Sequence, residues 1–145
     1  MPSSTRGATA VVLLAAAGTT LAGCAGPGVM EGDAESAVTD FYAAVAAQDG
    51  QAACAMLLPD AAEALEKDAQ APCATALVED PQVAPALAHR AADATVAEVH
   101  VSGTQAQVIT ASDTVFLTRS GDRWIVTAAA CEQRPERPYD CEVQA

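Results

Sequence analysis

The hydrophobic pattern of the chain changes its period once, near Ala94. Before this residue apolar side chains recur at helical spacing, and after it apolar and polar residues alternate, as is typical of strands. In residues 35–48 the i, i+3, i+4, i+7 positions that mark one helix face are all apolar: Val38, Phe41, Tyr42 and Val45. We therefore expect helices first and a sheet afterwards.

Three shorter helices are expected after the first one: residues 51–58, 60–68 and 73–78. Gly50 follows the first helix at a position typical of a helix end. Pro81 and Pro85 then interrupt the helical pattern, because proline lacks the backbone N–H that a helix interior needs. The sequence thus predicts a proline-bounded loop that contains His89.

Four strands are expected after the change of period: residues 95–101, 105–111, 113–119 and 123–130. The connections between them are only a few residues long, so neighbouring strands must run antiparallel. The side chains expected to face the helices alternate along these strands: Val99, Val101, Val115, Leu117, Trp124 and Val126. Phe116 is out of phase with its neighbours, which indicates that both faces of its strand are partly covered.

Helices followed by an antiparallel meander predict an α+β fold, with the N-terminal helices packed on one face of a four-stranded sheet. The tail after Cys131 contains Pro135 and Pro138 and is not expected to form a central strand. We expect it to fold back as a loop.

The first 23 residues resemble a signal peptide. Arg6 supplies one positive charge, residues 8–17 form an apolar run, and the segment ends in LAGC at 21–24. LAGC resembles the lipobox of bacterial lipoproteins almost letter for letter. The resemblance implies cleavage before Cys24 and a diacylglyceryl thioether on its sulfur, and two acyl chains anchor a protein stably where one would bind only marginally.

Two other interpretations of this segment stay open. An uncleaved transmembrane helix would need about 20 apolar residues, and this run is short and interrupted. A plain secretory signal would leave Cys24 as an ordinary cysteine. On the lipobox interpretation, residues 1–23 are removed, residues 24–33 form a lipidated flexible tether, and residues 34–145 form one domain on the extracytoplasmic face of the cell membrane.

The remaining four cysteines favour disulfides, because their number is even and the domain is expected to be exported. Four cysteines allow three pairings, and the sequential one, Cys54 with Cys73 and Cys131 with Cys141, closes two short loops. By chain entropy each bridge would contribute roughly 3 kcal/mol. A zinc site is the alternative, but structural zinc usually takes cysteine pairs with two to four residues between them, and here 18 and nine residues intervene. No metal is therefore expected.

The mature chain is strongly acidic. After residue 23 there are 19 acidic and six basic side chains, a formal net charge of −13. This charge repels nucleic acid phosphates, so we expect no nucleic-acid partner. The acidic residues are scattered, which is typical of a solvated surface. Much of the hydrophobic content is alanine, which buries little surface, so the domain needs reinforcement by its disulfides.

The order of elements and several short phrases resemble a known group of proteins. The phrases are AV at 37–38, FY at 41–42, DG at 49–50, ACA at 53–55, LP at 58–59, DTVFL at 113–117, WIVTAAAC at 124–131 and PYDCEV at 138–143. They resemble small lipoproteins of high-GC Gram-positive bacteria with a nuclear-transport-factor-2-like (cystatin-like α+β) domain. The resemblance implies a curved, cone-like sheet, and its superfamily includes isomerases, dehydratases, polyketide cyclases and many binding domains.

No residue stands out as a catalytic group. His89 and His100 are expected at the surface, Asp113 is expected to form a turn, and Tyr139 is expected to pack the tail onto the sheet. In the enzymes that the chain resembles, a pocket lies between sheet and helices. The candidates for lining such a pocket are Phe41, Tyr42, Val45, Val99, Val101 and Trp124.

The function expected from the sequence is a lipid-anchored, non-enzymatic binding or interaction module. Apart from membrane lipid held through Cys24, its expected partner is an envelope protein or a small apolar ligand, and no cofactor is expected. One alternative is an enzyme of the ketosteroid-isomerase or polyketide-cyclase type acting on a small apolar substrate. Another is a structural module that helps to organise envelope proteins.

Overall fold

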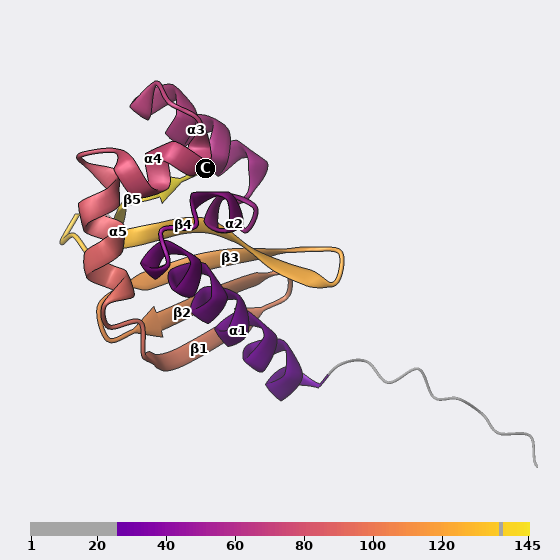
Figure 1. The fold of residues 1–145 in the computed structure, drawn as a ribbon. Coiled ribbons are helices and arrows are strands. Elements are labelled where there is room, and N and C mark those ends of the chain that lie inside the picture. The colour runs from indigo at the N-terminus through magenta and orange to yellow at the C-terminus, as the bar shows by residue number, and fades with distance from the viewer. Residues whose placement is uncertain (1–25, 137) are drawn as a thin grey trace, which may run out of the picture.

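The computed structural model describes residues 26–136 and 138–145, in which helices precede an antiparallel sheet (Figure 1). The helices are α1 (Pro27–Ala46), α2 (Gly50–Cys54), α3 (Pro59–Ala69), α4 (Cys73–Glu79) and α5 (Val83–Ala91). The strands are β1 (Val96–Ser102), β2 (Gln105–Thr110), β3 (Thr114–Ser120), β4 (Arg123–Glu132) and β5 (Asp140–Gln144). They pair in the order β1-β2-β3-β4-β5, every neighbour antiparallel. The α+β fold is confirmed.

The core lies between the helices and one face of the sheet. Figure 1 shows α1 crossing this face, while α3, α4 and α5 gather toward the end where β5 lies. Four of the residues expected to face the helices are buried: Val115, Leu117, Trp124 and Val126. The other two, Val99 and Val101, are partly buried against the core because β1 is an edge strand. Strand alternation therefore identified the inner face correctly.

Helix α1 begins eight residues earlier than expected. Its first turns include residues 27–33, which the sequence assigned to the tether. Pro27 occupies the first helical position, where its missing N–H is not needed. Met30 packs against the core, its carbonyl oxygen accepts a hydrogen bond from Trp124 Nε1 at 3.2 Å, and Ala34 is fully buried. These contacts outweigh the low helix propensity of the glycines in this segment.

The expected proline-bounded loop is a helix, α5. Pro85 is its third residue, and the first four N–H groups of a helix have no partner within the helix. Asp80 Oδ1 accepts hydrogen bonds from the N–H groups of Gln82 and Val83 at 2.9 and 3.0 Å and so organises the helix start. His89 lies exposed in the last turn instead of in a loop.

The tail forms a fifth strand, so the expectation of four strands was wrong. Pro135 and Pro138 both fall in the connection before β5, where they interrupt no ladder. Cys131 and Cys141 lie directly opposite each other in the β4–β5 register. Tyr139 packs on the outer face of the sheet, as expected: its ring lies 4.9 Å from that of Phe116, and its hydroxyl accepts a hydrogen bond from Gln107 Nε2 at 3.1 Å.

Both expected disulfides are present. Cys54–Cys73 joins the last residue of α2 to the first residue of α4, and Cys131–Cys141 joins β4 to β5. Gly50 has a different role from the one expected, because it begins α2 and packs against α4. A Cβ atom at this position would lie 1.9 Å from the carbonyl oxygen of Ala74. Glycine therefore permits the close approach of the two helices that the first disulfide joins.

Candidate functional site

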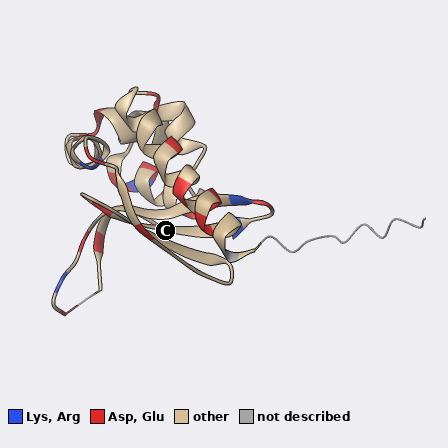
Figure 2. Cartoon of the chain, turned by 90° about the horizontal axis from the view of Figure 1, so that it is seen from below, with Lys and Arg blue, Asp and Glu red and all other residues tan. Residues whose placement is uncertain are grey.

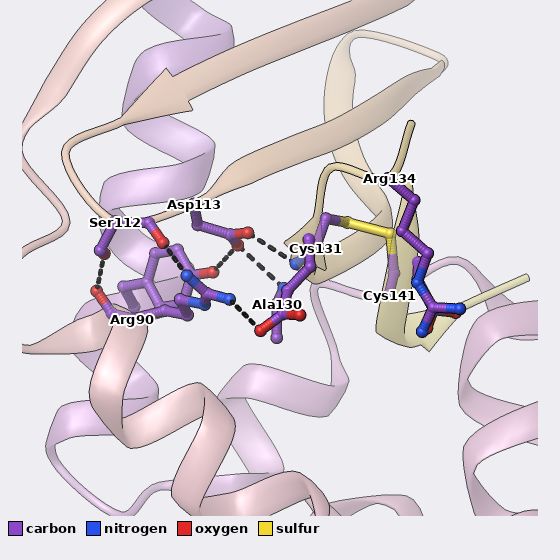
Figure 3. Close-up of polar contacts among 10 residues, drawn as sticks. Arg90, Ser112, Asp113, Ala130, Cys131, Arg134 and Cys141 are labelled. Atoms are coloured by element: carbon purple, nitrogen blue, oxygen red, sulfur yellow. Dashed lines mark hydrogen bonds and ion pairs between the residues drawn. A yellow bond between two sulfur atoms is a disulfide. The ribbon is translucent and has the colours of Figure 1, made fainter. Parts of the chain in front are cut away.

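A buried carboxylate, that of Asp113, lies where α1, β3 and β4 meet (Figure 3). The side chain accepts hydrogen bonds from the backbone N–H groups of Ala130 at 2.8 Å and Cys131 at 2.7 Å. It also accepts one from the hydroxyl of Tyr42 on α1. Strand β3 begins at Thr114 while β4 continues to Glu132, so the Asp113 carboxylate takes the place of a strand partner for two amides of β4.

The local sequence holds Asp113 in this position. Thr110 and Asp113 close the β2–β3 turn, since the Thr110 N–H donates to the Asp113 carbonyl at 2.8 Å and the Asp113 N–H donates to Thr110 Oγ1 at 2.9 Å. The guanidinium of Arg90 donates to the carbonyl of Ser112, and Ser112 Oγ donates to the carbonyl of Arg90 at 2.9 Å. These bonds fix the turn to the end of α5.

Ala130 has a left-handed backbone, with φ of 53°. For a residue other than glycine this conformation costs about 1–2 kcal/mol. At this left-handed residue the consecutive N–H groups of Ala130 and Cys131 both donate to the Asp113 carboxylate. Hydrogen bonds to a charged acceptor contribute about 1.5–3 kcal/mol each, so they outweigh the conformational cost.

Burial raises the pKa of the Tyr42 hydroxyl far above its ordinary value of 10, and the adjacent Asp113 charge and hydrogen bond raise it further. Tyr42 is 1% exposed and Asp113 is 6% exposed. The hydroxyl therefore stays protonated and serves as a donor, and both carboxylate oxygens are already bonded. A catalytic acid or base must reach a proton of its substrate, whereas these atoms face the packed interior. The geometry supports a structural role for the pair.

The sequence predicts that Asp113 lies in a turn, and its backbone does lie in one. The buried position of its carboxylate was not predicted. The signal was present in the strand period, because Asp113 is in phase with Val115 and Leu117, which both point inward. An acidic residue that continues an inward apolar face indicates a buried and partnered carboxylate.

A second feature is a surface groove of about 290 Å³ between α1, the segment after α2 and the β3–β4 hairpin. Its lining residues are Asp33, Ser36, Ala37, Asp40, Ala55, Met56, Asp122, Arg123, Trp124, Ile125 and Val126. Ala37, Met56 and Trp124 are buried or partly buried and form an apolar floor, whereas the three carboxylates and one guanidinium belong to exposed residues and form the rim. The groove thus combines an apolar surface with a mainly negative border.

Acidic positions recur along α1, the helix that leads to the grey N-terminal trace in Figure 2. Two of them, Asp33 and Asp40, line the groove and are exposed. Asp122 and Arg123, at the tip of the β3–β4 hairpin, line the same groove. Because the rim carries a net negative charge, it favours cationic groups over anionic ones.

All six residues that were candidates for lining a pocket belong to one hydrophobic core or pack against it. Phe41, Tyr42 and Val45 are buried in the core. Val99 and Val101 are partly buried on the edge strand β1. Trp124 alone of the six lines the groove, although only 6% of it is exposed.

His100 is exposed, as expected, and its Nε2 lies 3.1 Å from a carboxylate oxygen of Glu98. Cys24 lies outside the described residues. Within residues 26–136 and 138–145, no three His, Cys, Asp or Glu side chains are grouped to hold a metal ion. In the same part of the chain no helix is long and apolar enough to cross a membrane.

In comparisons with known proteins, no family model, no curated protein and no solved structure matches this chain.

Proposed function

We propose that this protein is a membrane-anchored extracytoplasmic lipoprotein whose domain is a non-enzymatic binding module with the groove beside α1 as its binding site. The groove carries the proposal, because an apolar floor bordered by a few charged groups is the usual form of a recognition site. The LAGC motif at 21–24 supports the lipid anchor. The two disulfides favour an oxidising compartment, as an exported domain requires.

The fold supports the same proposal. Helices packed on an antiparallel sheet agree with the resemblance to nuclear-transport-factor-2-like lipoproteins. We propose in addition that the sheet has the cone-like curvature of that group. Helix α1 begins three positions after Cys24, and three residues span at most about 11 Å. A lipidated Cys24 would therefore keep the groove close to the membrane, where it would meet other envelope proteins.

An enzyme of the ketosteroid-isomerase type is the alternative, and the desolvated Tyr42–Asp113 pair is the observation in its favour. Enzymes do place such pairs in their pockets. Here, however, the carboxylate accepts two backbone N–H groups in addition to the tyrosine hydroxyl. We therefore favour a binding module.

The anchor is tested by replacing Cys24 with serine. We expect the wild-type protein in the membrane fraction with the mass of a chain that begins at an acylated Cys24. The Cys24→Ser variant should lose both properties because no thioether can form. An unlipidated wild-type chain, or unchanged membrane retention of the variant, would refute the anchor.

The binding site is tested by photo-crosslinking in cells. A benzoylphenylalanine residue at Ala55, which is exposed on the groove, should capture a discrete partner. Benzoylphenylalanine in place of Glu98 is the matched control, because Glu98 is exposed on the edge strand β1, away from the groove. Equal crosslinking at both positions, or none at Ala55, would count against the groove.

A further inference from the structure

Residues 123–126 of β4 line the groove, and two hydrogen bonds show how the backbone of this stretch is oriented. The N–H of Val126 donates to the Met56 carbonyl at 2.8 Å, and the carbonyl of Val126 accepts the Leu58 N–H at 2.7 Å. Both groups of Val126 therefore point away from β3. In an antiparallel strand every second residue directs its N–H and C=O to the same side, so those of Trp124 also point away from β3.

Other chain segments cover the rest of this side of β4. Strand β5 pairs with residues 128–132, and residues 56–58 lie beside Val126. Arg123 and Trp124 line the groove at the end of β4 that precedes these partners, and we infer that the edge of β4 is open there. The groove therefore has a backbone edge as well as side-chain walls.

We propose that this groove binds an extended, basic peptide segment of a partner protein, which adds to β4 as a short strand beside Trp124. This inference rests on the proposed binding function. In strand addition the main-chain hydrogen bonds give affinity, and pockets for alternate side chains give specificity. The apolar floor at Ala37 and Met56 takes one set of side chains, and the other set meets the acidic rim.

Charge selects a basic segment. Asp33, Asp40 and Asp122 border the groove, against one cation at Arg123. The mature chain carries a net charge of −13, which steers positively charged partners toward it and repels anionic ones. A volume of about 290 Å³ lies just below the usual range for a small-molecule pocket, roughly 300–1,000 Å³, and suits a few residues of a peptide.

Binding can be measured with the sole tryptophan of the chain, Trp124, as the reporter. The lipidated protein in nanodiscs of zwitterionic lipid is titrated with an acetylated, amidated hexapeptide of alternating lysine and valine. We expect saturable fluorescence change with this probe and none with the glutamate–valine counterpart. The Asp33→Asn/Asp40→Asn variant should bind about tenfold more weakly, a loss of about 1.4 kcal/mol, because it removes two of the three carboxylates on the rim.

The control for charge is Glu63→Gln on α3, an exposed site away from the groove, combined with Asp60→Asn. It removes the same number of charges and should leave the affinity within about twofold. If both double variants weaken binding equally, attraction by the overall charge explains the result and the groove inference is refuted.

The strand geometry is tested with N-methylated probes. Methylation of every second amide blocks one edge of an extended peptide, and methylation of the other amides blocks the opposite edge. One probe should lose at least tenfold in affinity while the other keeps it, because only one edge can pair with β4. Equal binding of both methylated probes would refute strand addition.

These results separate the inference from the proposed function. A crosslinked partner at Ala55 together with no binding of the lysine–valine probe would retain the binding module and overturn the basic-peptide inference. No crosslinking at Ala55 and no probe binding would overturn both.

Discussion

Replacing Asp113 with asparagine should destabilise the domain by about 3 kcal/mol. The Asp113 carboxylate accepts two backbone N–H groups and the Tyr42 hydroxyl, and an amide offers only one acceptor oxygen in the same place. Whichever way the amide turns, its NH₂ group faces the N–H of Ala130 or that of Cys131. An unsatisfied buried N–H costs about 1–3 kcal/mol, and the remaining bonds lose their charge assistance.

This loss is large relative to the total stability of a small domain, about 5–15 kcal/mol. Urea unfolding of the oxidised protein, followed by Trp124 fluorescence, measures it directly. Asp122→Asn is the matched control, because that carboxylate is exposed in a turn and should change stability by less than about 0.5 kcal/mol. A loss below about 1 kcal/mol for Asp113→Asn would refute the argument.

A double-mutant cycle with Tyr42→Phe tests the contact between the two side chains. Removing the hydroxyl alone should cost about 1–2 kcal/mol, since it removes a donor to a charged acceptor. The two substitutions together should cost less than the sum of the single losses, because both remove the same hydrogen bond. Additivity within about 0.3 kcal/mol would mean that the pair is not coupled.

Three further predictions concern pH and glycines. The pKa of Tyr42 is raised in the folded state, so its contribution to the free energy of unfolding is complete below pH about 10. Above that pH the unfolded chain loses the tyrosine proton, and stability should fall, less steeply in Tyr42→Phe than in the wild type. Equal slopes of stability against pH in alkaline urea titrations would contradict this. Gly28 lies at an exposed position of α1, and a Cβ atom there would have no other atom within 4 Å. Gly28→Ala should therefore raise stability by about 0.5–1 kcal/mol, because alanine has a higher helix propensity than glycine. An unchanged melting temperature would argue against the early start of α1. Gly50→Ala should lower stability by more than about 2 kcal/mol in the same assay, because its Cβ would meet the Ala74 carbonyl at 1.9 Å, and unchanged stability would contradict the close approach of α2 and α4.

The hydrophobic period alone determined the fold class, the position of the helices before the sheet, and the inner face of the sheet. These features follow from local spacing, because a helix and a strand place their apolar residues at different periods. The structure also contains the sequential disulfide pairing, which the sequence favoured among three possible pairings because it closes two short loops. In these respects the structure agrees with the pattern.

Only the tertiary structure decided the early start of α1, the fifth strand and the partners of the Asp113 carboxylate. Met30 becomes helical through its contact with Trp124, which lies 94 residues away, and Tyr42 meets Asp113 across 71 residues. Strand β5 forms beside β4, although prolines precede it, because a disulfide and a ladder hold the two strands together. Local periodicity carries no information about such distant partners. The groove beside α1 and β4 depends on these partners, so only the packed structure determines it.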